Sequence, residues 1–208
     1  QMAVITIAFV LYMASTTSGV TRGIKWLSNG NLALAVLLLL LVLALGPVSF
    51  IFDIFTTTLG AYLSQLVSMS LRMSPFTAST WVQDWTIFYW AWWISWSPFV
   101  GIFIARISKG RTVREFVLGV VIAPTLLGFL WFSVFGGAAM WEQMFGNGQM
   151  VAAVQSGYQN VLFALLDTYP AATFLAGVTI LLLVIFFVTS ADSAVLVLAT
   201  MSSPERGD

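Results

Sequence analysis

Long apolar stretches alternate with short polar ones along this chain. A helix that crosses a bilayer needs about 20 largely apolar residues, because each residue rises about 1.5 Å and the hydrocarbon core is about 30 Å thick. The polar, basic run TRGIKWLSNGN follows the first apolar stretch and predicts a loop. The pattern predicts five spans, at residues 2–20, 32–52, 85–105, 116–137 and 171–197.

Two other segments show helical spacing with one polar side. In residues 53–72, apolar side chains form one stripe and serines and threonines fill the rest, which predicts an amphipathic helix along the membrane interface. Residues 150–168 repeat this pattern more weakly and predict one short helix. The polar stretch at 73–80 predicts a joint between structural halves. The stripe of the first segment consists of Phe55, Leu59, Tyr62, Leu63, Leu66 and Val67.

Composition sets the fold class. The 208 residues are 60% hydrophobic and 8% charged, with a mean hydropathy of +0.97. Soluble domains carry roughly 25% charged residues, and so small a share could not cover a surface exposed to water. We therefore expect an all-α, polytopic helical membrane protein. Eight basic and eight acidic residues give no net charge, which argues against a nucleic-acid partner.

The basic residues are distributed unevenly between the two ends of the predicted spans. If all five spans cross, only Arg72 lies on one side. Because cytoplasmic loops are rich in lysine and arginine, the opposite side is predicted to face the cytoplasm, in a multi-pass protein of the cell membrane. The other seven basic residues lie there: Arg22, Lys25, Arg106, Lys109, Arg111, Arg114 and Arg206.

The composition also excludes several kinds of chemistry. The chain has no histidine and no cysteine, so a thiolate or imidazole metal site and a Ser-His-Asp triad are both excluded. With no nucleophile–base pair or metal-ligand cluster in sight, we expect neither an enzyme nor an organic cofactor. The chain begins at Gln1, already inside an apolar stretch and without a signal peptide. We expect a piece of a longer protein.

The most informative segment is the third predicted span, which contains WTIFYWAWWISWSPF. Its aromatic residues form a continuous stripe on one helix face. Trp92, Trp93 and Trp96 lie roughly 10 to 16 Å beyond Trp85 at about 1.5 Å per residue, which is too deep for an interfacial aromatic belt. The stripe runs in steps of 4, 3, 4, 3 and 4 through Trp85, Tyr89, Trp92, Trp96, Phe99 and Phe103.

Two interpretations of these deep tryptophans stay open on the residues alone. One is bulky packing between helices. The other is a cage for a quaternary ammonium, which has no N–H donor and is held through the faces of aromatic rings. Pro98 follows directly and cannot donate to the carbonyl of Ile94. This carbonyl is therefore predicted to be free near the midplane, either in a simple kink or in a weakened helix that lines a cavity.

A second polar site interrupts the fifth predicted span, in the sequence FFVTSADS. Thr189, Ser190 and Ser193 carry hydroxyls, and hydroxyl and carbonyl oxygens suit a small hard cation such as sodium. The alternative is that the hydroxyls only bond back to the helix. Asp192 is costly inside a span. We expect it to pair with a loop arginine near the cytoplasmic end rather than to bind the ion.

These segments together resemble the betaine/choline/carnitine transporter family. The resemblance is carried by WTIFYWAWWISWSPFVGIFIARISKGRTVREF, WFSVFGGAA, FFVTSADS and SGVTRGIKWLSNGN, and it extends over essentially the whole chain. It implies a fold of two inverted five-helix repeats. Residues 1–52 would then hold the last two spans of the first repeat, residues 53–80 the amphipathic linker helix and joint, and residues 81–208 the first three spans of the second repeat.

The resemblance also implies roles for single residues. Trp93 matches the tryptophan that faces the trimethylammonium group, and Trp92 and Trp96 match its aromatic neighbours along the path. Phe103 matches an aromatic residue on the cytoplasmic side, and Phe99 matches a residue beside one proposed sodium site. A second sodium site would use the carbonyl of Phe186 with the hydroxyls of Thr189 and Ser190. No metal other than sodium is implied.

The implied function is secondary active import of a quaternary ammonium osmolyte by alternating access. The segment SPFVG favours sodium-coupled uptake of glycine betaine, with proton-coupled choline uptake as the alternative and carnitine as a further possible substrate. An alternative of another class is a membrane sensor or channel component that binds a methylammonium without pumping it. The resemblance further implies a homotrimer in the lipid bilayer, formed partly through residues 53–72.

Overall fold

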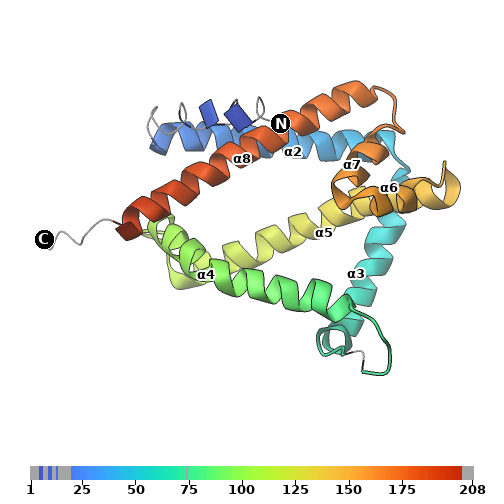
Figure 1. Cartoon of the computed structure of the whole chain (residues 1–208), viewed down its shortest axis with the longest axis horizontal. Helices are drawn as coiled ribbons and strands as arrows, with labels where there is room; N and C mark the ends of the chain where they lie inside the picture. Colours follow the sequence, from blue (N-terminus) through green and yellow to red (C-terminus); the bar gives the residue numbers. More distant parts are fainter. Residues whose placement is uncertain (1–4, 7–8, 11–12, 14–19, 74, 203–208) are drawn as a thin grey trace, which may run out of the picture.

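The computed structural model describes residues 5–6, 9–10, 13, 20–73 and 75–202. Within these residues the chain forms helices and no strands (Figure 1). The long helices are α2 (Val20–Leu45), α3 (Val48–Ser70), α4 (Phe88–Ile107), α5 (Val113–Phe145) and α8 (Ala172–Ser202). The short ones are the π-helix η1 (Val82–Ile87), α6 (Met150–Ser156) and α7 (Tyr158–Leu166).

Five of the described helical segments are long and apolar enough to cross a membrane: Trp26–Leu45, Val48–Ser70, Val82–Ala105, Val113–Phe145 and Ala172–Val195. Four of them overlap predicted spans. The fifth is α3, where the sequence predicts an interfacial helix. In Figure 1, α3 runs across the direction of α2 and α8, and its place along the interface stays a prediction. The predicted span at 2–20 falls largely outside the described residues.

Several predicted boundaries are wrong. The run TRGIKWLSNGN is helical, because α2 already begins at Val20. Polar residues lower hydropathy, but without a proline they leave the local i to i−4 hydrogen bonds of a helix intact. The same helix ends at Leu45 rather than at Phe52, and the following residues belong to α3. The single short helix predicted at 150–168 is two helices, because Gly157 separates them with a φ of +139°.

A glycine and a proline make the break between α2 and α3. A Cβ on Gly46 would lie 2.7 Å from the carbonyl oxygen of Val42 and 3.0 Å from the hydroxyl of Tyr169. Pro47 caps the start of α3. Burial, together with the charge of Glu142, raises the pKa of Tyr169 to about 12, so its hydroxyl stays protonated near neutral pH. Only a residue without a side chain fits so close to both groups, which explains the glycine at this turn.

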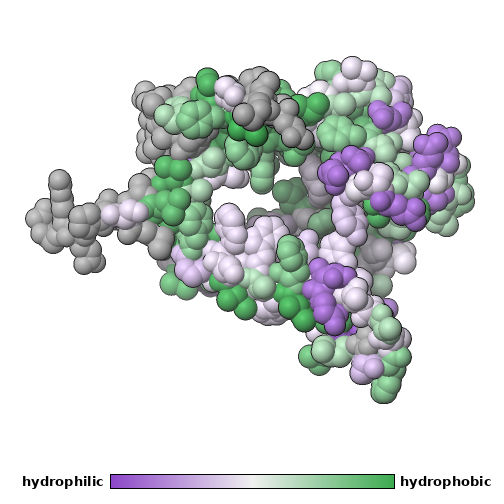
Figure 2. All heavy atoms as spheres, in the orientation of Figure 1, coloured by the Kyte–Doolittle hydropathy of each residue, from purple (hydrophilic) through white to green (hydrophobic). Residues whose placement is uncertain are grey.

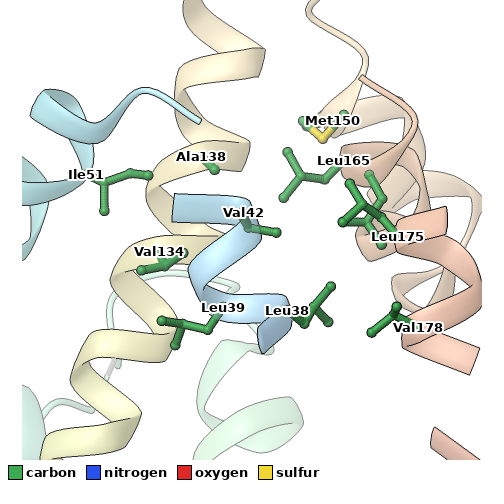
Figure 3. Close-up of a cluster of buried hydrophobic side chains, with 11 residues drawn as sticks. Leu38, Leu39, Val42, Ile51, Val134, Ala138, Met150, Leu165, Leu175 and Val178 are labelled. Carbon is green, nitrogen blue, oxygen red and sulfur yellow. The ribbon is translucent and has the colours of Figure 1, made fainter. Parts of the chain in front are cut away.

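The buried core lies where α2, α5, α7 and α8 meet (Figure 3). Helices α2 and α8 pack along each other, and α5 packs against both α2 and α3. No residue of this cluster comes from α4, whose aromatic face is left outside it. The cluster consists of Leu38, Leu39, Val42, Ile51, Val134, Ala138, Met150, Leu165, Leu166, Leu175 and Val178.

Candidate functional site

The aromatic segment forms one continuous helical rod made of η1 and α4. It begins with a π-helical stretch, Val82–Ile87, that leads directly into the α-helix at Phe88. Within it, the carboxylate of Asp84 accepts a hydrogen bond of 2.6 Å from the hydroxyl of Thr80. The π-helical stretch is not predicted by the sequence pattern. Such stretches are often found at functional sites, but apolar spacing carries no signal for them.

Three tryptophans of α4 line one open groove of about 580 Å³. Trp92, Trp93 and Trp96 are 47%, 69% and 50% exposed, so their rings are accessible. The structure therefore brings together the three deep tryptophans that the sequence predicts as substrate-binding. The remaining lining residues are Tyr89, Ser97, Val100, Gly101 and Ile104.

Ring contacts hold several aromatic side chains of η1 and α4 in place along the helix. The ring centroids of Tyr89 and Trp92 are 5.8 Å apart, and Trp85 stacks on Tyr89 with an interplanar angle of 12°. Farther along α4, Trp96 and Phe99 meet edge to face at 5.5 Å. Such contacts restrict the orientation of the rings. The groove is therefore walled by aromatic faces at spacings set by the helix.

The two phenylalanines that were predicted to bind substrate, Phe99 and Phe103, do not line the groove. Phe99 is half-buried and supports Trp96 by its ring contact, but it does not line the groove. Phe103 is also half-buried and lies outside the groove. Sequence reasoning missed Val100, Gly101 and Ile104 as groove residues. Helical spacing could have found them, because Trp93, Val100 and Ile104 follow at steps of seven and four.

The carbonyl freed by Pro98 is occupied in the structure. The hydroxyl of Ser97 donates a hydrogen bond of 3.0 Å to the oxygen of Ile94, which is the acceptor that proline leaves without its amide partner. Helix α4 continues through Pro98 to Ile107. The prediction of a free carbonyl was therefore wrong, because the side chain next to the proline satisfies that acceptor.

The polar cluster of FFVTSADS lies in an unbroken helix. The hydroxyl of Thr189 donates to the carbonyl of Ile185 at 3.1 Å and to that of Phe186 at 3.0 Å. Ser193 donates to the carbonyl of Thr189 at 2.9 Å. Two of the oxygens predicted to hold sodium, on Phe186 and Thr189, are thus already close neighbours. Ser190 is exposed on the same turn of α8.

Asp192 lies about one turn beyond Thr189 and is buried, with 5% of its surface exposed. Helix α8 contacts α4, and Figure 1 shows them meeting toward the C-terminal end of α8. Within the described residues, no group of three or more acidic, histidine or cysteine side chains could hold a metal ion. The structure thus offers an aromatic groove on one helix and a cluster of neutral oxygens on its neighbour.

Known proteins resemble this chain along its whole length. The profile of the betaine/carnitine/choline family transporters matches residues 1–208. The glycine betaine transporter OpuD of Bacillus subtilis is 48% identical over 205 residues, which is 98% of this chain and 40% of that relative. The ectoine/hydroxyectoine transporter of Virgibacillus pantothenticus is 42% identical over 203 residues, which is 98% of this chain and 40% of that relative.

A third relative is the high-affinity choline transport protein of Escherichia coli, which is 42% identical over 202 residues, or 97% of this chain and 30% of that protein. The chain thus spans two fifths or less of the length of these relatives. The apolar helices and the relatives together identify a multi-pass membrane protein. Since the family profile covers all 208 residues, the chain belongs to the betaine/carnitine/choline family of transporters.

Proposed function

We propose that the protein to which this chain belongs imports glycine betaine, with sodium as the coupling ion. Members of its family are transporters, not enzymes. The observation that carries the substrate proposal is the groove of Trp92, Trp93 and Trp96 on α4. A trimethylammonium group cannot be gripped by directed hydrogen bonds, and each aromatic face attracts it by about 0.5–2 kcal/mol, depending on desolvation.

The chemistry of betaine supports this assignment. Its cationic end fits the tryptophan faces, and its carboxylate would be held by a helix end or a cation elsewhere in the longer protein. A carboxylate in the groove would attract ordinary ammonium ions as well, whereas aromatic faces select a cation that carries little water. The relative with 48% identity is a glycine betaine transporter by name. Choline stays the alternative substrate, because another relative is a choline transport protein by name.

Sodium coupling is proposed from α8. The carbonyl oxygen of Phe186 and the hydroxyl oxygens of Thr189 and Ser190 are neutral hard ligands, which suit Na⁺. Thr189 already lies 3.0 Å from the carbonyl of Phe186. Phe99 is proposed to support a second ion position through its packing on Trp96. Alternating access would then expose the groove and these ligands to one side of the membrane at a time, around a fixed site near the midplane.

The test of the substrate site is uptake of labelled betaine by the full-length protein carrying Trp93→Leu. Loss of one cation–π contact should raise KM by about 2- to 30-fold. The matched control is Trp90→Leu, since Trp90 lies on the same helix and is 67% exposed but does not line the groove. Equal KM values for the two variants would contradict the proposed cage.

Pumping is tested separately from binding. The full-length protein is reconstituted in vesicles, and labelled betaine is followed under an inward sodium gradient. Accumulation above the external concentration supports a transporter. Equilibration without accumulation would identify a sensor or channel component, and accumulation driven only by a proton gradient would favour proton coupling. Betaine, choline, carnitine and ectoine, compared as competitors, rank the substrates.

A further inference from the structure

The connection between α4 and α5, which is predicted to be cytoplasmic, carries a second groove that adjoins the tryptophan groove, because Gly101 and Ile104 line both. Arg111 lines it together with apolar residues of both helices, and its volume is about 370 Å³. We propose that this groove binds an anionic phospholipid of the cytoplasmic leaflet, with the headgroup phosphate at Arg111 and an acyl chain along the apolar wall. The full lining is Gly101, Ile104, Ala105, Ser108, Arg111, Thr112, Val113 and Phe116.

The charge of this segment favours an anion. Residues 106–114 contain four basic side chains, and Glu115 is the one acidic residue between Asp84 and Glu142. Its carboxylate accepts hydrogen bonds from the backbone N–H of Thr112 at 3.0 Å and from the Thr112 hydroxyl at 2.9 Å, and it also interacts with the charge of Arg111, so the segment keeps an excess of positive charge. Basic clusters directly cytoplasmic of a span attract anionic lipids, with a charge at the headgroup contributing about fivefold in affinity and more distant charges contributing less because of screening.

The turn between the helices fixes the position of Arg111. The N–H of Arg111 donates a hydrogen bond of 3.0 Å to the carbonyl of Ser108, and the N–H of Ser108 donates one of 3.0 Å to the carbonyl of Ile104. Gly110 has a φ of +89°, in the region that favours glycine. This tight turn brings Arg111 back over the end of α4, so that its charge stands beside an apolar wall.

The combination of charge and apolar surface points to a lipid rather than to a soluble anion. A free phosphate would use only the basic side chains. It has no apolar part that could contact the wall formed by Ile104, Ala105 and Phe116. The wall belongs to the ends of two helices that are apolar enough to span the membrane, Val82–Ala105 and Val113–Phe145. A phospholipid of the leaflet has its phosphate and its acyl chain at the same boundary between charge and hydrocarbon.

The test uses the full-length protein in phosphatidylcholine nanodiscs that contain increasing fractions of a photoactivatable phosphatidylglycerol. Labelling of residues 101–116 is located by mass spectrometry, and the mole fraction for half-maximal labelling is measured. Arg111→Gln should raise this fraction about fivefold, and Arg111→Lys should largely restore it. Ala105→Leu should also raise it, because the larger side chain narrows the groove.

The matched control is Arg114→Gln, since Arg114 belongs to the same basic segment and is exposed but does not line the groove. Its half-maximal fraction should stay within about twofold of the unmodified protein, since it removes only diffuse charge. If Arg111→Gln and Arg114→Gln raised the half-maximal fraction equally, the lipid would be attracted by the overall charge of the segment and not by a site at Arg111. That result would overturn the proposal. Labelling outside residues 101–116, or competition by phosphatidylcholine as strong as by phosphatidylglycerol, would overturn it as well. Size-exclusion profiles confirm that each variant is folded.

Discussion

At the scale of single residues, the hydroxyl of Thr189 is a proposed sodium ligand that lies inside an intact helix. A hydroxyl has one donor hydrogen and two acceptor lone pairs. Thr189 uses its hydrogen toward the carbonyls of Ile185 and Phe186, and this orientation directs its lone pairs away from those carbonyls. A cation held by the oxygens of both Thr189 and Phe186 therefore requires this hydrogen to turn away from Phe186. The two interpretations drawn from the sequence, back-bonding and ion binding, thus need two orientations of the same hydroxyl, and the structure shows the back-bonded one.

This leads to a prediction for sodium. In the full-length protein, Thr189→Ala together with Ser190→Ala should raise the sodium concentration for half-maximal betaine uptake on the order of tenfold, the effect of losing about 1.4 kcal/mol of ion binding. Betaine affinity at saturating sodium should change less. Thr179→Ala is the matched control, because that buried hydroxyl also bonds back to its own helix, to Leu175 at 2.9 Å. A variant pair with an unchanged sodium dependence would refute the assignment.

The tryptophan stripe of α4 and the hydrogen bond beside Pro98 differ in how far the sequence could predict them. The stripe through Trp92, Trp93 and Trp96 follows from helical geometry alone, because spacing fixes the direction of a side chain on a helix. The bond from Ser97 to Ile94 depends on a side-chain rotamer, which spacing does not determine. The faces were therefore predictable, and the hydrogen bonds on them were not.

At the scale of elements, hydropathy located the apolar centres of the helices better than their ends. Helix α2 extends over a polar run because backbone hydrogen bonds do not depend on side-chain polarity, and it ends at Gly46 and Pro47 although the residues on both sides are apolar. A helix end is set by local sterics, while a span is set by transfer into lipid. The end of a helix and the end of an apolar span therefore coincide only where a polar run also contains a glycine or proline that stops the helix.

The break between α2 and α3 gives a prediction about stability. Gly46→Ala would place a Cβ 2.7 Å from the backbone oxygen of Val42, which has little freedom to move. We expect a destabilisation of about 1–3 kcal/mol, measured as a lower apparent Tm of the full-length protein in detergent. Gly128→Ala is the control, because nothing lies within 4 Å of its Cβ position in α5. That change should leave Tm equal or raise it, since alanine favours helix by about 1 kcal/mol. An equal change in Tm for the two variants would show that the contact between residue 46 and the oxygen of Val42 does not destabilise Gly46→Ala.

At the scale of the whole molecule, the arrangement of helices leaves the tryptophan groove of α4 outside the buried core. Figure 2 shows apolar surface over much of the outside and an opening between α2 and α8 on one side and α4 on the other. The chain spans 40% of its glycine betaine transporter relative. We expect further spans of the longer protein to cover α4 and to complete the substrate site, so the sequence of this part alone could predict one wall of the groove but not the opposite wall.

Helix α3 carries a second exposed surface, and it supports the proposed trimer. Thr56, Gly60, Leu63 and Val67 follow at steps of four, three and four, so they share one stripe of the helix. Leu63 and Val67 are 65% and 70% exposed. The α5-facing side of α3 is different, because Tyr62 packs there on Phe129 at 5.3 Å. Small residues beside apolar ones allow helices to approach closely in a membrane, which suits a contact between subunits.

The corresponding prediction is that Leu63→Gln with Val67→Gln converts a trimer of the full-length protein to monomers, as measured by light scattering after size-exclusion chromatography in mild detergent. Two amides on this stripe would remove apolar packing from each subunit contact. Leu126→Gln is the matched control, since Leu126 on α5 is 62% exposed and lies off this stripe, so it should leave the assembly unchanged. A monomeric unmodified protein would contradict the trimer itself. A double variant that remains trimeric would instead place the subunit contact on another surface, and the exposed stripe of α3 would then face lipid.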